Sequence, residues 1–326
     1  MIELRDHALE FRFPEVHEQA RCAINFQRTL RIPDDNRSYP LPPGLGRFPL
    51  AHVDDFADRL PAAWKTHGGV FLPMYQAEAM WLHFGGGYPC AIKIAAGKIN
   101  AVTGKAWANG LTATPQDYVV VPGQPWLDGF CVTTGLIRQF VAMPLGEGFT
   151  AEEQLTGEAT HGGLQLVVYP MKREVYRQRF EDAQRFREIC CKEAAPCLSV
   201  SEMGLAPGGL MHQHIYEDDH GIDAWDQEHG SRCFVHIVNS VQYQQITGHP
   251  PPHAPPSAKD YSAAGLPWFA YYDDRTAIDG SPELQKLLSV AAAWAAKGKG
   301  VMPDNDAVVP KVVRTLGKGA VREGEF

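Results

Sequence analysis

Histidine, aspartate and glutamate are most concentrated in residues 212–229, where they occupy ten of 18 positions. If the chain is extended here, His212 and His214 project from the same face, because strand side chains repeat every two residues. Two such imidazoles can chelate one divalent metal, while Glu217 in the adjoining turn and His236 on a later strand can complete the shell. This ligand set suits Fe(II), Mn(II) or catalytic Zn(II) with a coordination position left open. The sequence therefore predicts a metal-dependent enzyme centred on His212 and His214, for oxidation or hydrolysis.

The residues around these histidines resemble the first motif of the cupins. A Pro-Gly turn at 206–209 precedes His-x-His and a later glutamate, Glu217, as in that motif. The resemblance implies that the two histidines and the glutamate share one metal ion. Gly209 stands closer to His212 than the motif has it, the gap from His214 to Glu217 is shorter, and the second cupin motif is absent from the sequence. The alternative interpretation is an acidic surface loop with two histidines at a strand edge.

Aromatic residues offer a second candidate site. Six tryptophans are too many to be buried without polar partners for their indole N–H groups. Flat rings beside amides are typical of surfaces that bind sugars or peptides. The candidate residues are Trp64, Trp81, Trp107, Trp126, Trp225, Trp268, Tyr75, Gln76, Arg138 and Gln139. They predict, as the alternative function, a non-catalytic binding or self-assembling protein with a carbohydrate or peptide ligand; the plainer interpretation places most of them in the core. A third functional class is an enzyme that uses no metal and whose site the sequence does not reveal.

Composition and charge exclude several partners. Of 326 residues, 44% are hydrophobic, and the net charge of −8 disfavours binding to nucleic acid or to an anionic membrane surface. The longest apolar run, Leu287–Ala296, has ten positions, whereas a bilayer span needs about 20. The sequence contains neither a Walker A loop nor Gly-x-Gly-x-x-Gly, so no nucleotide cofactor is expected. A small-molecule ligand and a homo-oligomer both remain compatible with these features.

Cysteine usage indicates a reducing compartment. The seven cysteines are an odd number, scattered through the chain without a Cys-x-x-Cys pair. The charged N-terminus, residues 1–7, is unlike the apolar core of a signal peptide. We therefore expect a cytoplasmic protein with reduced, mostly buried thiols.

Short strands with alternating apolar residues must position these candidates. Such strands are expected over residues 22–32, 91–94, 99–102, 118–121, 137–143 and 164–169. Their spacing predicts an α+β, mainly β fold, with a sandwich- or barrel-like core and a few amphipathic helices. The expected parts are a β-rich region at 1–170, a charged amphipathic helix at 171–198, a second β-containing lobe with a C-terminal helix at 199–298, and a tail at 299–326. The two lobes can share one core.

Two helices are expected to pack on that core. The first covers 172–193, with Val175, Tyr176 and Phe180 among its apolar residues. The second is expected over 282–296, because Ser281 is a good N-cap and Pro282 suits the first helical position. Its apolar stripe is made of Leu284, Leu287, Leu288, Ala291 and Ala295.

Four short blocks resemble a family of uncharacterised proteins often filed as "integral membrane protein". The blocks are Gly69–Met74, Arg138–Ala142, Gly162–Gln165 and Gly265–Phe269. The resemblance implies no activity and no site residue. Its membrane description conflicts with the hydropathy of the chain, which predicts no membrane partner.

Overall fold

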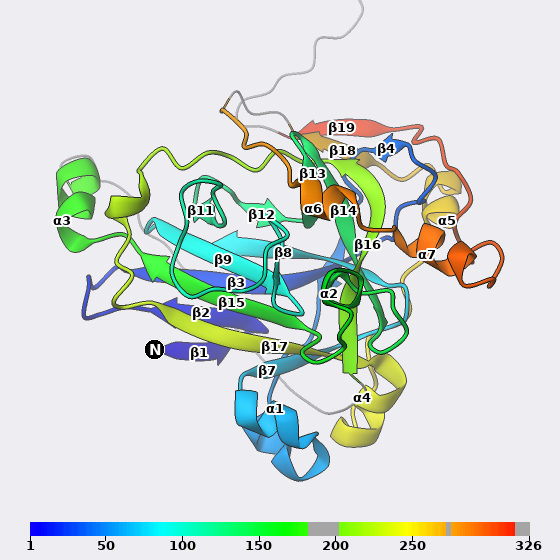
Figure 1. Ribbon diagram of the computed structural model, residues 1–326, viewed down its shortest axis with the longest axis horizontal. Helices are drawn as coiled ribbons and strands as arrows, with labels where there is room; N and C mark the ends of the chain where they lie inside the picture. The colour runs from blue at the N-terminus through cyan, green and yellow to red at the C-terminus, as the bar shows by residue number, and fades with distance from the viewer. Residues whose placement is uncertain (182–201, 272–274, 317–326) are drawn as a thin grey trace, which may run out of the picture.

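A computed structural model describes residues 1–181, 202–271 and 275–316 of the chain. Most of its strands hydrogen-bond into one large, mainly antiparallel sheet, with a few short helices around it (Figure 1). This arrangement confirms the predicted α+β, mainly β class.

Strands follow one another closely along the chain. The first ten are β1 (Ile2–Arg5), β2 (Ala8–Arg12), β3 (Arg21–Thr29), β4 (Ser38–Tyr39), β5 (Gly44–Arg47), β6 (Ala51–His52), β7 (Val70–Met74), β8 (Ala79–Gly85), β9 (Cys90–Ala96) and β10 (Ile99–Asn100). The next are β11 (Val119–Val121), β12 (Trp126–Leu127), β13 (Gly129–Thr133), β14 (Leu136–Pro144), β15 (Leu164–Pro170), β16 (Glu202–His212) and β17 (Ser231–Asn239). A separate pair of parallel strands consists of β18 (Trp268–Tyr271) and β19 (Val313–Leu316).

The large sheet curls around a hydrophobic core. Antiparallel pairings lead from β1 through β2, β3, β8, β14, β16, β17 and β15 to β9. Strands near both ends of this path contribute to the same core cluster, among them β3 with Phe26 and β15 with Leu166. Figure 1 accordingly shows β2 and β3 behind β9 and β15. Strands from the expected 1–170 and 199–298 parts pair directly, β14 with β16 and β15 with β17.

The predicted strands are confirmed where the apolar alternation is regular. In β3, Cys22, Ile24 and Phe26 are fully buried. The predicted hairpin is also present, because β9 pairs with β10 across a turn in which Lys98 and Gly97 have positive φ. These two residues allow the chain to reverse direction within a short loop.

The helices are short and lie outside the large sheet. They are α1 (Ala62–His67), α2 (Ala151–Thr156), α3 (Arg173–Tyr176), α4 (Ser240–Thr247), α5 (Ala258–Ala263), α6 (Pro282–Gln285) and α7 (Val290–Ala296), with 3-10 turns at Asp54–Arg59 and Ile222–Ala224. A π-helical turn, Arg177–Glu181, follows α3. The expected charged helix over 172–193 is thus described only as far as residue 181, and its remainder lies outside the described residues.

The expected C-terminal helix is two helices, and the prediction of one continuous helix is wrong. The Ser281 side chain caps α6 as expected, but the Ser289 side chain accepts from Ala292 N and starts a new helix, α7. Gln154 holds the junction between them by bonding both the N–H and the carbonyl of Leu288. Leu288 is therefore 49% exposed instead of packing in the stripe, while Leu287 is 4% exposed.

The lengths of the helices contradict the membrane description that came with the family resemblance. Within residues 1–181, 202–271 and 275–316, no helix is long and apolar enough to cross a bilayer. The filing "integral membrane protein" that came with the family resemblance is therefore wrong for this chain.

Candidate functional site

The strand register places two tryptophans and several polar side chains on one face of the sheet. Trp126 of β12 lies opposite His83 of β8, and Trp81 of β8 lies opposite Gln27 of β3. Because side chains alternate along a strand, Trp81 and His83 share a face with Trp126, while Leu82 points to the core on the other face. This alternation brings Trp81 and Trp126, 45 residues apart in sequence, to one polar and aromatic surface.

A small pocket opens between these tryptophans, and we call it the aromatic pocket. It is lined by Leu41, Pro42, Gly44, Trp81, Trp126, Asp128, Phe269 and Leu316. Its volume is about 190 Å³. Phe269 comes from β18, and the neighbouring Tyr271 packs edge-on against Trp126, with 4.8 Å between ring centroids. The pocket therefore joins the edge of the large sheet to the small β18–β19 sheet.

Asp128 carries the one charge among the described residues that line the aromatic pocket. Only 4% of this residue is exposed, and its carboxylate oxygen Oδ2 has no hydrogen-bond partner. Burial raises the pKa of Asp128 to about 7, although a hydrogen bond with the Trp126 side chain acts in the opposite direction. A buried polar atom without a partner is costly in a folded protein and calls for a structural explanation.

The predicted metal-binding segment borders this pocket and supports its strand. His212 ends β16, so His214 lies beyond the strand; both residues are exposed and border a very small hollow beside Trp126. Gln213, between them, is buried and faces inward. Its Oε1 accepts from the backbone N–H of Asp128 at 2.9 Å, and its Nε2 donates to the carbonyl of Trp126 at 3.2 Å. The Gln213 amide therefore holds together the two residues that give the pocket its ring and its charge.

Glu217 faces a different cavity. It lines a cleft of about 530 Å³ together with Asp218, Asp279 and Glu283. Asp218 is held there by two donors, Tyr118 Oη at 2.6 Å and Trp225 Nε1 at 2.8 Å. The carboxylate of Asp218 is thus engaged in fixing the core tryptophan.

His236 lies in a third environment, between aromatic rings. Its imidazole stacks on Trp64, with ring centroids 4.1 Å apart, and on Phe234 at 4.4 Å. Its Nε2 contacts the carbonyl oxygen of Gly68 at 3.1 Å. Burial lowers the pKa of His236 to about 3, so this ring stays neutral at ordinary pH.

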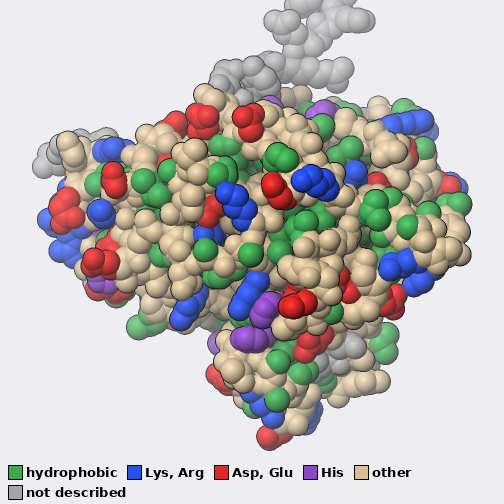
Figure 2. Space-filling view, viewed as in Figure 1, with side chains coloured by type: hydrophobic (Ala, Val, Ile, Leu, Met, Phe, Trp, Pro, Cys, Tyr) green, Lys and Arg blue, Asp and Glu red, His purple; other side chains and the backbone are tan. Residues whose placement is uncertain are grey.

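His67 extends this cluster toward the surface near α1. Its ring stacks on Phe234 and lies 6.2 Å from that of His161 and 6.4 Å from that of His236. Figure 2 shows histidine side chains gathered in this area. His236 therefore lies near His67, whereas the sequence analysis grouped it with His212 and His214.

The four predicted metal ligands consequently occupy separate surroundings, apart from the neighbouring His212 and His214. Among the described residues there is no group of three or more His, Cys, Asp or Glu side chains that could hold a metal ion. Metal binding by His212 and His214 stays a prediction, without Glu217 or His236 beside them in support.

The other aromatic candidates are mostly structural. Trp64, Trp225 and Trp268 are at most 2% exposed. The Trp268 indole N–H is satisfied by Ser262 Oγ at 3.1 Å, and Trp107 lies against the Lys93 ammonium, 5.6 Å from its ring centroid. Of the six tryptophans singled out in the sequence, Trp81 and Trp126 are the two that line the aromatic pocket.

The polar candidates are likewise engaged elsewhere. Gln139 is fully buried, and its amide bonds the backbone of Leu30 and Ile32. Tyr75 and Gln76 line another cavity, of about 390 Å³.

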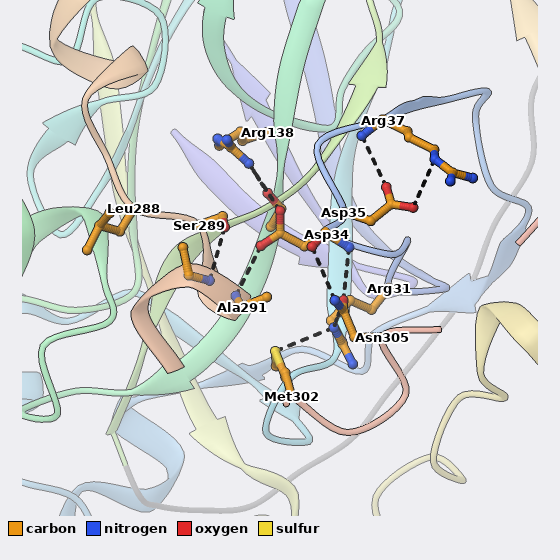
Figure 3. A network of polar contacts seen from close by, with 12 residues as sticks. Arg31, Asp34, Asp35, Arg37, Arg138, Leu288, Ser289, Ala291, Met302 and Asn305 are labelled. Carbon is orange, nitrogen blue, oxygen red and sulfur yellow. Dashed lines mark hydrogen bonds and ion pairs between the residues drawn. The ribbon is translucent and has the colours of Figure 1, made fainter. Parts of the chain in front are cut away.

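Arg138 belongs to a structural network centred on Asp34, shown in Figure 3. The Asp34 carboxylate pairs with Arg138 at 3.4 Å and accepts from Ala291 N at 3.0 Å. Asn305 adds two bonds to the Asp34 backbone. The network anchors α7 and the chain that follows it to the sheet.

Sequence reasoning missed Asp128 and the part played by Phe269. The signal for Asp128 was its spacing of two residues from Trp126, which puts both on one face of an extended segment. Phe269 is far from Asp128 and both tryptophans in the sequence, so no local pattern indicates that it lines the same pocket.

Comparison of the chain with family models, with curated proteins and with solved structures finds no match.

Proposed function

We propose that this chain is a non-catalytic binding protein that holds one group of a carbohydrate or peptide ligand in the aromatic pocket. The observation that carries the proposal is the buried Asp128 carboxylate, with Oδ2 unpartnered, beside the half-buried rings of Trp81 and Trp126. Apolar walls with a few placed polar groups are the usual composition of ligand sites. Aromatic rings add contact area at small conformational cost.

The chemistry of the lining favours binding over hydrolysis. Glycoside hydrolysis generally needs two carboxyl groups that flank the scissile bond. Asp128 is the one carboxylate that the described lining residues provide. The metal-dependent alternative has less geometric support, because only His212 and His214 of its four ligands lie together.

The surface charge and the thiols support two further parts of the proposal, a partner other than nucleic acid and a cytoplasmic location. The net charge is −8, and acidic and basic side chains are interspersed over the face in Figure 2, which favours a partner other than nucleic acid. Cys22, Cys90, Cys131 and Cys233 are free thiols. These features suit a cytoplasmic protein.

Ligand screening with two matched tryptophan variants tests the proposal. Oligosaccharides and peptides would be titrated into the wild-type protein and followed by tryptophan fluorescence and calorimetry. We expect Trp126→Ala to reduce the affinity for any ligand found by at least tenfold. Trp107→Ala, which removes a half-buried tryptophan outside the pocket, should leave that affinity unchanged. Equal affinity in wild type and in folded Trp126→Ala would refute the proposed site.

A further inference from the structure

The size of the aromatic pocket restricts what can enter it. Its volume of about 190 Å³ is smaller than the roughly 300–1,000 Å³ of sites for drug-sized molecules. The pocket thus has room for one compact group of a ligand, while the rest of the ligand stays outside. The chemistry of its walls then decides which group fits best.

The lining contains few hydrogen-bonding side chains. Besides Asp128, the lining side chains are aliphatic or aromatic, apart from Gly44. The Gln213 amide beneath Trp126 and Asp128 is already bonded to their backbone. A sugar ring would bring several hydroxyl groups, each of which costs free energy if it is buried without a partner. A carbohydrate is therefore the poorer fit of the two ligand classes.

A compact cation matches both features of the pocket. The faces of Trp and Phe rings attract ammonium groups, and aromatic cages are a recurrent way to bind quaternary ammonium. A buried carboxylate is stabilised when an opposite charge lies close to it. An alkylated ammonium would place its positive charge beside the Asp128 carboxylate and its alkyl groups against the aromatic rings.

We propose that the group held by Trp81, Trp126, Phe269 and Asp128 is an alkylated ammonium. This inference rests on the proposed function, since it names the chemistry of the ligand at the same pocket. A free quaternary amine and the trimethylated lysine of a peptide share this chemistry. The two sources differ only in what lies outside the pocket.

A charged probe and its neutral isostere test the inference. Choline, tetramethylammonium and 3,3-dimethyl-1-butanol, which replaces the nitrogen of choline by carbon, would be titrated at pH 8 and followed by calorimetry and NMR. A peptide with trimethyllysine, beside the same peptide with unmodified lysine, distinguishes the two sources. We expect choline to bind at least tenfold more tightly than the neutral isostere, and Asp128→Asn to remove that preference. The control Asp219→Asn changes an exposed carboxylate outside the pocket and should retain the preference.

The outcomes separate this inference from the proposed function. Equal affinity for choline and the neutral isostere, with both lost in Trp126→Ala, would overturn the ammonium assignment and leave the binding pocket standing. A carbohydrate that binds through Trp126 while neither choline nor either peptide binds would overturn it as well. If no probe, sugar or peptide is affected by Trp126→Ala, both proposals fail. A trimethyllysine peptide that binds at least tenfold more tightly than choline would support the inference and identify a peptide as the source.

Discussion

The side-chain oxygen of Gln213 accepts a hydrogen bond from the backbone N–H of Asp128, at 2.9 Å across 85 residues of sequence. The same amide donates to the carbonyl of Trp126. The segment that the sequence marked for its two histidines thus contributes its middle residue to the aromatic pocket. His212 and His214 point outward on either side of it. This relationship allows the two functional hypotheses to be tested separately by neighbouring substitutions.

Replacement of Gln213 should destabilise the segment that carries Trp126 and Asp128. Gln213→Ala leaves the buried backbone N–H of Asp128 without its partner, which costs about 1–3 kcal/mol, while the Trp126 carbonyl keeps the hydrogen bond that Gln124 Nε2 donates at 3.0 Å. His212→Ala changes an exposed neighbour and should alter the free energy of unfolding by less than about 0.5 kcal/mol. Urea denaturation of both variants measures these values. Equal stability of the two variants would show that the Gln213 bridge does not support the pocket.

The buried carboxylate should make the stability depend on pH. The pKa of Asp128 is raised to about 7 from an ordinary value of 3.8, mainly by burial. The group therefore contributes most stability below pH 4, and this contribution is lost as the pH rises from about 4 through 7. The difference between these values corresponds to about 4 kcal/mol at most. We expect Asp128→Asn to gain stability relative to wild type between pH 5 and pH 8, as measured by urea denaturation at each pH.

The control for this pH dependence is an exposed carboxylate. Asp219→Asn should follow the wild-type profile throughout. A constant difference in stability between Asp128→Asn and wild type from pH 4 to pH 8 would contradict the raised pKa.

Two adjacent leucines test the docking of the C-terminal segment. Leu287 is 4% exposed and belongs to the main core, whereas Leu288 is 49% exposed. Leu287→Ala should cost about 2–5 kcal/mol through lost burial and a residual cavity, and Leu288→Ala less than about 0.5 kcal/mol. Thermal and urea unfolding of the pair give the comparison. Similar losses in both variants would favour a continuous helix over the two short helices.

Regular alternation explains why much of the fold was predictable. The residues of β3 alternate and those of β9 are apolar except Lys93, so the burial of their apolar side chains follows directly from the period of a strand. The break in the C-terminal helix depended on two side chains, Ser289 as a new N-cap and Gln154 bonded to Leu288. Of these two residues, only Ser289 lies within the sequence of the expected helix. A serine within an apolar run carries no signal that distinguishes an N-cap from a tolerated interior position.

The candidate site was less predictable because it is assembled from distant segments. Trp126 begins β12 and Asp128 follows it, and this strand is only two residues long, so no extended period marks the segment. The other ring that lines the pocket from β18, Phe269, follows 141 residues after Asp128 in the sequence. The histidine-rich segment did attract attention for its composition. Composition alone could not reveal that Gln213, between the histidines, makes the inward contact.

Thiol accessibility should change sharply on unfolding. Burial raises the pKa of Cys131 and of Cys233 to about 12 and raises that of Cys90, which also contacts Cys22. Thiols kept protonated react slowly. We expect a thiol reagent to label Cys22, Cys90, Cys131 and Cys233 slowly in the native protein, and close to seven thiols per chain to react after denaturation without reductant. A count of one thiol, which three disulfides would leave, would contradict the proposal of a cytoplasmic protein.

The final prediction concerns metal binding by His212 and His214. With two exposed imidazoles, and no third ligand beside them in the part of the chain that the structure describes, we expect any divalent metal to bind weakly. Binding should weaken further at acid pH, because only neutral imidazole ligates a metal. Added Zn(II) should therefore raise the melting temperature only at a large excess, and the double variant His212→Ala/His214→Ala should abolish that effect. The same variant should keep the choline affinity of the aromatic pocket, since both side chains point away from Gln213. Stoichiometric Fe, Mn or Zn in untagged wild-type protein, lost in the double variant, would instead restore the metal-dependent enzyme as the leading function.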